Sequence, residues 1–198
     1  MKAKIMGLVA IGALAVAGSA SAQNDIALGT PGYGGSGCPS GSVSATLSPD
    51  NRSLSLIFDD YQVSAGGTTG RSFDRKSCNV AIPVFVPEGY SVSVLSVDYR
   101  GFNRLPPRAS SQFNVEYFFA GGRGGVPPHL LRRARLRLPD QQRAHCAELG
   151  LVTCGADVNL RTNSSMRVNT VNNAEAMATV DSQDVNAAIV YRLNWRRC

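Results

Sequence analysis

The amino-acid sequence predicts an all-β fold: one antiparallel β-sandwich, or barrel-like, domain that is stapled by disulfides. Three observations predict it. Short segments in which apolar and polar residues alternate recur along the chain. Turn-forming Gly, Pro and Asn residues separate these segments at near-regular intervals. All five cysteines lie beyond an N-terminal segment that is typical of exported proteins, where disulfides are the expected state.

Residues 1–22 predict a signal peptide, and therefore a secreted, extracellular protein. Lys2 and Lys4 form a short positive region, the apolar run from Ile5 to Ala17 follows, and Ala20-Ser21-Ala22 fits a small-x-small cleavage pattern. The apolar run is shorter than the ~20 residues that a membrane helix needs, and an uncleaved anchor helix is the alternative. No other segment of the sequence is long and apolar enough to span a bilayer.

Residues 23–37 are Gly-rich and lack periodicity, which predicts a flexible arm ahead of a domain that spans residues 38–198. The domain begins with a hairpin pattern, because Val43 to Leu47 and Leu54 to Phe58 alternate on either side of a turn at Ser48 to Asn51. Tyr61 to Ala65 is expected to extend this hairpin. Further strands are predicted, in chain order, at Val80 to Val86, Tyr90 to Tyr99, Phe113 to Phe119, Val158 to Val171 and Ala187 to Trp195.

Two of these predicted strands carry a further signal. Proline cannot donate a backbone hydrogen bond, so Pro83 predicts an edge or a bulge in the strand from Val80 to Val86. In the last strand, the odd-numbered residues share one face, which is expected to point into the core, while Arg192 and Asn194 lie on the other face. The core-facing set comprises Ile189, Tyr191, Leu193 and Trp195.

The net charge of +6 does not indicate a nucleic-acid partner once its distribution is considered. Lys2 and Lys4 leave with the signal peptide. Residues 121–153 carry six arginines against Asp140 and Glu148, which accounts for the rest of the excess. Because the remainder of the mature chain is neutral, the sequence predicts no nucleic-acid partner and, after cleavage, no membrane span.

Residues 121–153 depart from the strand pattern of their neighbours. Alternation stops, arginines crowd between Arg132 and Arg137, and His129, His145 and Cys146 all fall here. The stretch is open to four interpretations: a basic loop that binds a polyanion, a processing signal, a solvated loop, or a local frameshift in the coding sequence. The frameshift is favoured, because suitable codons read one base later restore strand-like or turn-like sequence. On that hypothesis the stretch is expected as loop or poorly packed helix outside the sheets.

Several short stretches together resemble one family of proteins. They are Gly37-Cys38-Pro39, Leu47-Ser48-Pro49-Asp50, Ile57-Phe58-Asp59-Asp60-Tyr61, Arg75-Lys76-Ser77-Cys78, Val86-Pro87-Glu88-Gly89-Tyr90, Ser96-Val97-Asp98-Tyr99-Arg100-Gly101-Phe102 and Leu193-Asn194-Trp195-Arg196-Arg197-Cys198. In order and spacing they resemble the domain of unknown function 4360 family, secreted proteins of bacteria and fungi. The resemblance implies a secreted β-rich fold with paired cysteines and no known activity. It fails over residues 121–153, where a Trp-Ser-Pro-like run is expected ahead of Cys154, and the shifted frame supplies that run.

With Cys146 set aside, four cysteines are predicted as disulfide residues: Cys38, Cys78, Cys154 and Cys198. They allow three pairings. Cys38–Cys78 with Cys154–Cys198 is favoured, because each pair brackets one half of the domain. Each bridge is expected to contribute about 2–4 kcal/mol. A zinc site is the alternative, but the sequence has no Cys-x-x-Cys spacing and exported proteins meet oxidising conditions.

No catalytic set emerges from the sequence. Ser-His-Asp and Cys-His catalysis both need a histidine, and His129 and His145 lie in the irregular stretch. Four acidic residues are candidates for a calcium site or an acid pair, although no spacing fixes their geometry, and the first two are more typical of a turn cap. They are Asp59, Asp60, Asp98 and Asp181.

Aromatic residues in the predicted strands are either core residues, which is favoured, or a platform for stacking sugars. They are Tyr90, Tyr99, Phe102, Tyr117, Phe118 and Phe119. Asn51-Arg52-Ser53 and Asn163-Ser164-Ser165 are N-glycosylation acceptors in a eukaryotic host. The sequence therefore predicts a secreted, non-enzymatic domain without cofactor or metal, acting outside the cell or at its surface. The alternative is a carbohydrate-binding or carbohydrate-active protein, with extracellular polysaccharide or a cell-surface component as partner.

Overall fold

Strands make up nearly all of the regular structure in the computed structural model, which describes residues 26–121, 132–136, 144–180 and 189–198. Over 132–136 and 144–149 the backbone alone is described, and the predicted signal peptide lies outside the described residues. The strands are β1 (Ala27–Leu28), β2 (Gly32–Gly34), β3 (Val43–Leu47), β4 (Ser53–Phe58), β5 (Gln62–Ala65), β6 (Phe73–Phe85), β7 (Tyr90–Tyr99), β8 (Phe102–Arg104), β9 (Ser110–Ala120), β10 (Arg132–Leu136), β11 (Ala144–Leu149), β12 (Val158–Asn169), β13 (Ala176–Thr179) and β14 (Ile189–Arg197). A short 3₁₀ turn, η1 (Gly67–Thr69), follows β5.

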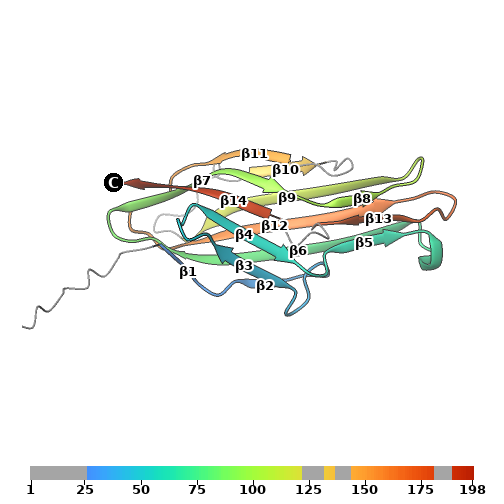
Figure 1. Cartoon of the computed structure of the whole chain (residues 1–198), viewed down its shortest axis with the longest axis horizontal. Coiled ribbons are helices and arrows are strands. Elements are labelled where there is room, and N and C mark those ends of the chain that lie inside the picture. Colours follow the sequence, from blue (N-terminus) through green and yellow to red (C-terminus); the bar gives the residue numbers. More distant parts are fainter. Residues whose placement is uncertain (1–25, 122–131, 137–143, 181–188) are drawn as a thin grey trace, which may run out of the picture.

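Two antiparallel sheets form the layers of a sandwich (Figure 1). Sheet A has the order β1-β6-β12-β9-β10, with β2 also paired to β6, and sheet B has the order β11-β7-β14-β4-β3. A small third sheet, sheet C, has the order β5-β13-β8 and continues one end of the molecule. The predicted all-β, antiparallel, disulfide-bonded fold is confirmed.

The core lies between sheets A and B, where alternate residues of each strand are buried. In β12 the even-numbered residues point inward, and in β14 Ile189, Tyr191 and Leu193 do so, as the alternation predicts. Aromatic rings meet across the interface: Tyr117 of β9 lies 6.4 Å from Tyr191 of β14, between ring centroids, in an edge-on arrangement. Such pairs contribute about 0.5–1.5 kcal/mol beyond the area that they bury.

The expectation of a flexible arm over residues 23–37 is wrong for its described part, because β1 and β2 both pair with β6. The outer edge of β6 offers unpaired backbone groups, which the arm satisfies. Gly29 N donates to Pro83 O at 2.8 Å, so Pro83 turns its donor-free nitrogen toward the irregular join between β1 and β2. The arm also lies close to β6 after β2, where a Cβ on Gly35 would lie 2.2 Å from Ser77 O, so glycine is needed there.

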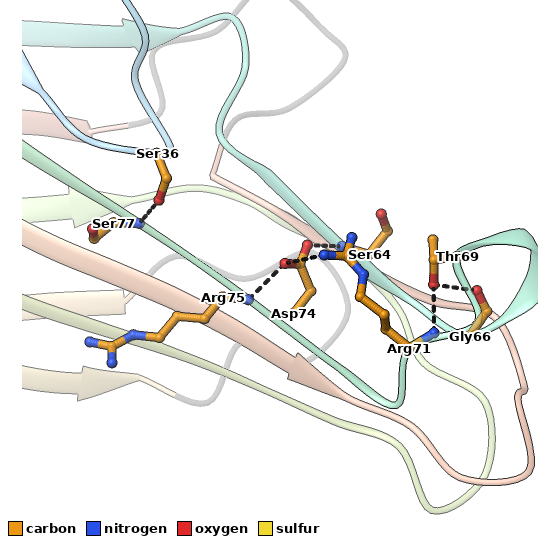
Figure 2. Close-up of polar contacts among 8 residues, drawn as sticks. All are labelled: Ser36, Ser64, Gly66, Thr69, Arg71, Asp74, Arg75 and Ser77. Carbon is orange, nitrogen blue, oxygen red and sulfur yellow. Dashed lines mark hydrogen bonds and ion pairs between the residues drawn. The ribbon is translucent and has the colours of Figure 1, made fainter.

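Strand β6 begins at Phe73, well before the predicted start at Val80. Asp74 and Lys76 lie on the same face of β6 as the buried residues Cys78 and Val80. Because two charged residues break the apolar pattern of that face, the sequence did not predict this part of the strand. Both turn instead to β5 and the turn before it: Asp74 Oδ2 accepts a hydrogen bond from Ser64 N at 3.0 Å, and Lys76 Nζ donates to Asp60 O at 3.4 Å. Figure 2 shows the first of these contacts.

The stretch at 121–153 contributes a strand to each sheet, so the expectation that it lies outside the sheets is wrong. Strand β10 extends sheet A beyond β9, with Arg132 opposite Tyr117 and Leu136 opposite Phe113. Strand β11 extends sheet B beyond β7, and these two edge strands contact each other. Backbone pairing at an open edge needs no alternation of side chains, which explains why the sequence pattern missed both strands.

Two disulfides join distant parts of the described chain, and they are the two pairs that the sequence analysis favours. Cys38, after β2, is bonded to Cys78 in the middle of β6, with 5.4 Å between the Cα atoms. Cys154, before β12, is bonded to Cys198, after β14, with 6.2 Å between the Cα atoms. The first bridge therefore links the N-terminal arm to sheet A. The second links the end of β14, in sheet B, to the segment that leads into β12, in sheet A.

Candidate functional site

The outer face of sheet A carries an array of polar side chains on its three neighbouring strands β6, β12 and β9. Residues directly opposite in antiparallel strands share a face, so the register arranges these side chains in three rows. The rows are Asn79, Asn163 and Glu116; Ser77, Ser165 and Asn114; and Arg75, Arg167 and Gln112.

This face is hollowed into a groove of about 670 Å³, which these nine residues line together with Ser164 and Val115. We call it the polar groove. Its volume falls within the range of about 300–1,000 Å³ that is typical of ligand sites. An outward polar face is ordinary for an antiparallel sheet, but a hollow of this size across three strands is not required by solubility alone.

Hydrogen bonds hold several of the groove side chains in place. Arg167 donates from its guanidinium to Gln112 Oε1, and Gln112 Nε2 donates to Asn114 Oδ1 at 2.9 Å. The chain of bonds crosses from β12 to β9 and orients one amide after the other. Gln112 and Asn114 therefore present oriented amide groups at this end of the groove.

The floor of the groove is tied to the core beneath it. Ser164 Oγ donates to Cys78 O at 3.0 Å, so the neighbouring Tyr61 hydroxyl, 3.1 Å away, donates to Ser164 Oγ. Burial raises the pKa of Tyr61 to about 12, so its hydroxyl keeps its proton at neutral pH. Cys78 lies between the groove residues Ser77 and Asn79, and its disulfide ties this part of β6 to Cys38.

The structure does not bring the predicted acidic candidates together. Asp59 and Asp60 are exposed after β4, whereas Asp98 is buried in β7 and lies 3.6 Å from the Arg192 guanidinium. Asp181 lies outside the described residues. Within the described part of the chain, no group of three His, Cys, Asp or Glu residues is placed to hold a metal ion.

The predicted aromatic set divides between core and surface. Tyr99, Tyr117 and Phe119 are buried in the core. Tyr90 is half-buried and lies under Arg197, whose guanidinium carbon is 5.8 Å from the ring centre. Phe118 is half-buried on the outer face of sheet A, one row beyond Glu116. The six residues therefore do not form one stacking platform.

The two histidines and the two glycosylation acceptors lie apart from one another in the sequence, and the structure describes three of the four. His145 lies in β11, whose backbone alone is described, and His129 lies outside the described residues. Of the two glycosylation acceptors, Asn51 lies in the β3–β4 turn and Asn163 lies in the polar groove. None of the helical structure that is described is long and apolar enough to cross a membrane.

The sequence analysis proposed none of the groove residues as a binding site: it named Arg75 and Ser77 within a family-like stretch and Asn163 as a glycosylation acceptor. The odd-numbered residues of β12 are polar throughout, which indicates an outward face, but a single strand does not reveal its neighbours. Only the register with β6 and β9 shows that three polar faces make one surface.

Comparison with known proteins gives a family and a curated relative. The family described as Domain of unknown function (DUF4360) matches residues 24–198. A protein of Arthroderma benhamiae (strain ATCC MYA-4681 / CBS 112371), described as an uncharacterized secreted protein, is 32% identical over 171 residues. The matched region covers 84% of this chain and 69% of the relative. With the two disulfides, this relationship confirms that the protein is secreted.

Among solved structures, the chain is similar to TmCBM61, determined in complex with beta-1,4-galactotriose. The two share 10% sequence identity and superpose with a TM-score of 0.32, over 85% of this chain and 88% of that chain. A TM-score this low supports no inference about the ligand of this chain.

Proposed function

The chain belongs to the family described as Domain of unknown function (DUF4360), and from this premise we propose that it is a non-enzymatic extracellular domain that binds polysaccharide through its polar groove. The observation that carries the proposal is the array of three rows on β6, β12 and β9. Amide and hydroxyl groups dominate the array, and both kinds of group donate and accept hydrogen bonds, as sugar hydroxyls do.

The dimensions of the groove support an extended ligand. Successive rows are two residues apart along each strand, so the outer rows are separated by about 13 Å. Phe73 lies on the same face one row beyond Arg75 and is 46% exposed, and Phe118 lies one row beyond Glu116 at the opposite end. Aromatic rings at both ends offer apolar faces against which sugar rings pack.

The charges of the groove support binding rather than hydrolysis. Glu116 is the only carboxylate among the described residues that line the groove. Glycoside hydrolysis in most families uses a pair of carboxyl groups, about 5–9.5 Å apart. A groove with one carboxylate and many neutral hydrogen-bonding groups is suited to holding a sugar chain without cleaving it.

The proposal is tested with purified secreted protein against a panel of soluble polysaccharides, by isothermal titration calorimetry and by an assay for newly formed reducing ends. We expect saturable binding to a member of the panel and no turnover. Asn114→Ala and Asn163→Ala should each weaken binding at least tenfold, or about 1.4 kcal/mol. The matched control Asn194→Ala, on the exposed outer face of sheet B, should leave binding unchanged. Absence of binding across the panel, or an equal loss in all three variants, would contradict the proposal.

A further inference from the structure

One end of the polar groove concentrates positive charge. Arg75 on β6 and Arg167 on β12 are exposed and lie directly opposite each other in the register. Like charges in such positions repel and weaken the pairing of two strands. A bound anion would offset the repulsion between these two arginines.

Acidic side chains nearby do not neutralise this pair. Asp74 is the next residue to Arg75, but its carboxylate points to the other face of β6, where it accepts hydrogen bonds from Ser64 N at 3.0 Å and Arg75 N at 2.9 Å (Figure 2). It also lies 4.0 Å from the Arg71 guanidinium. Glu116 is two rows away along β9, or about 13 Å. Within the described residues, neither Arg75 nor Arg167 forms an ion pair.

The two guanidinium groups are prepared for a ligand in different ways. The bond from Arg167 to Gln112 leaves the other guanidinium N–H groups of Arg167 available and holds the side chain over the groove. The Arg75 side chain extends away from the Asp74 cluster in Figure 2. A planar guanidinium matches a carboxylate with two parallel hydrogen bonds, which is a geometry that lysine does not offer.

We infer that the polar groove binds an acidic polysaccharide, with a sugar carboxylate held between Arg75 and Arg167 and the sugar hydroxyls on the neutral rows. The inference rests on the proposed function and specifies its ligand class. The Ser77 and Asn79 rows continue directly from the arginine row, so one sugar chain meets both kinds of group. The carboxylate also relieves the repulsion between the two arginines, which couples binding to the stability of the sheet.

The test compares two forms of one sugar chain: oligomers of polygalacturonate and the same oligomers with every carboxyl methyl-esterified. Titration calorimetry at 50 mM NaCl should give at least tenfold tighter binding for the free acid, and 200 mM NaCl should weaken that binding. Arg75→Gln and Arg167→Gln should each remove most of the difference between the two forms. Arg75 has no side-chain partner within the described residues, so Arg75→Gln is expected to fold normally. Arg196→Gln, an equal change of charge at an exposed position of β14, is the control and should change binding less than twofold.

The outcomes separate the two proposals. Equal binding of both forms, with loss on Asn114→Ala, would overturn the acidic ligand and leave polysaccharide binding intact. Equal loss in Arg196→Gln and Arg75→Gln would also overturn it, because attraction would then be non-specific. If neither form binds while a neutral polysaccharide of the panel does, the acidic ligand is wrong and the proposed function stands. If no polysaccharide binds, both are wrong.

Discussion

Thr162 on β12 and Tyr191 on β14 share a hydrogen bond that joins the two sheets through the middle of the core. Both residues are almost completely buried, at 1% and 0% exposure. Burial also raises the pKa of Tyr191, so this hydroxyl stays protonated well into the alkaline range. Because a buried hydrogen bond has a defined geometry, this contact favours one position of sheet A over sheet B.

The losses of stability on removing the two partners of this bond should not be additive. Tyr191→Phe leaves the Thr162 hydroxyl without its partner and should cost about 1–3 kcal/mol, as should Thr162→Val. The double variant should cost less than the sum of the single variants, because neither polar group is then left behind. Urea unfolding of the four proteins measures the coupling, and strictly additive losses would show that the bond does not form.

Stability should fall as the pH rises from 10 to 12. Unfolded tyrosine ionises near pH 10, whereas the pKa of folded Tyr61 is raised to about 12 by burial, so unfolding releases a proton in this window. Each such tyrosine should lower the free energy of unfolding by up to about 1.4 kcal/mol per pH unit. Tyr61→Phe should therefore show a shallower decline than the wild type in brief urea titrations, and the same decline in both proteins would refute the assignment.

Two glycines should respond very differently to substitution by alanine. Gly66 has a φ of +77°, and a Cβ there would lie 2.0 Å from Ala174 O, so Gly66→Ala forces the backbone to move. Gly70 has a φ of +64° but open space around it, so Gly70→Ala should cost only the backbone strain of about 1–2 kcal/mol. Thermal unfolding should place Gly66→Ala clearly below Gly70→Ala, and equal midpoints would argue against the tight loop contact.

Peptide mapping of the secreted, non-reduced protein should recover the bridges Cys38–Cys78 and Cys154–Cys198, with Cys146 outside both. Replacing both cysteines of the second bridge by serine should lower the free energy of unfolding by about 2–4 kcal/mol, because the unfolded chain gains freedom. Recovery of the four cysteines in another pairing, or reduced, would contradict the structure.

Phe73 should contribute to ligand binding and Phe85 should not. Each is 46% exposed on β6, but Phe73 adjoins the arginine row whereas Phe85 lies opposite Ala27 of β1. Both alanine variants should stay within about 0.5 kcal/mol of wild-type stability, since the rings are on the surface. In titration with a polysaccharide that binds, Phe73→Ala alone should weaken affinity, and an equal effect of the two variants would remove Phe73 from the site.

Local pattern was sufficient for the strands that have one apolar and one polar face. The bounds of β7 agree with the prediction of Tyr90 to Tyr99. In β14, Ile189, Tyr191 and Leu193 are buried on the predicted face, and Trp195 is half-buried against the core. The pattern failed where an inward-facing side chain is polar because its partner is polar. Asp74 and Lys76 are examples, since they bond to β5 and to the turn before it. It also missed β1, β2, β10 and β11, whose partner strands are β6, β9 and β7.

The polar groove could not be predicted because it depends on neighbours that are distant in sequence. Arg75, Gln112 and Arg167 lie on three separate strands, and the register between those strands is set by packing of the opposite face. Each outward residue, taken alone, is an ordinary surface residue. The frameshift hypothesis for residues 121–153 remains a prediction about the gene, and resequencing it together with peptide mapping of the secreted protein tests it.

The bridge from Cys198 to Cys154 determines how the domain responds to a mechanical load. Tension applied beyond β14 does not peel that strand from β7 and β4, because the covalent bond carries it to Cys154. From there the load enters β12, which is paired along its length with β6 and β9, so their backbone hydrogen bonds resist together in shear. A load at this end of the domain would therefore leave the strands of the polar groove paired.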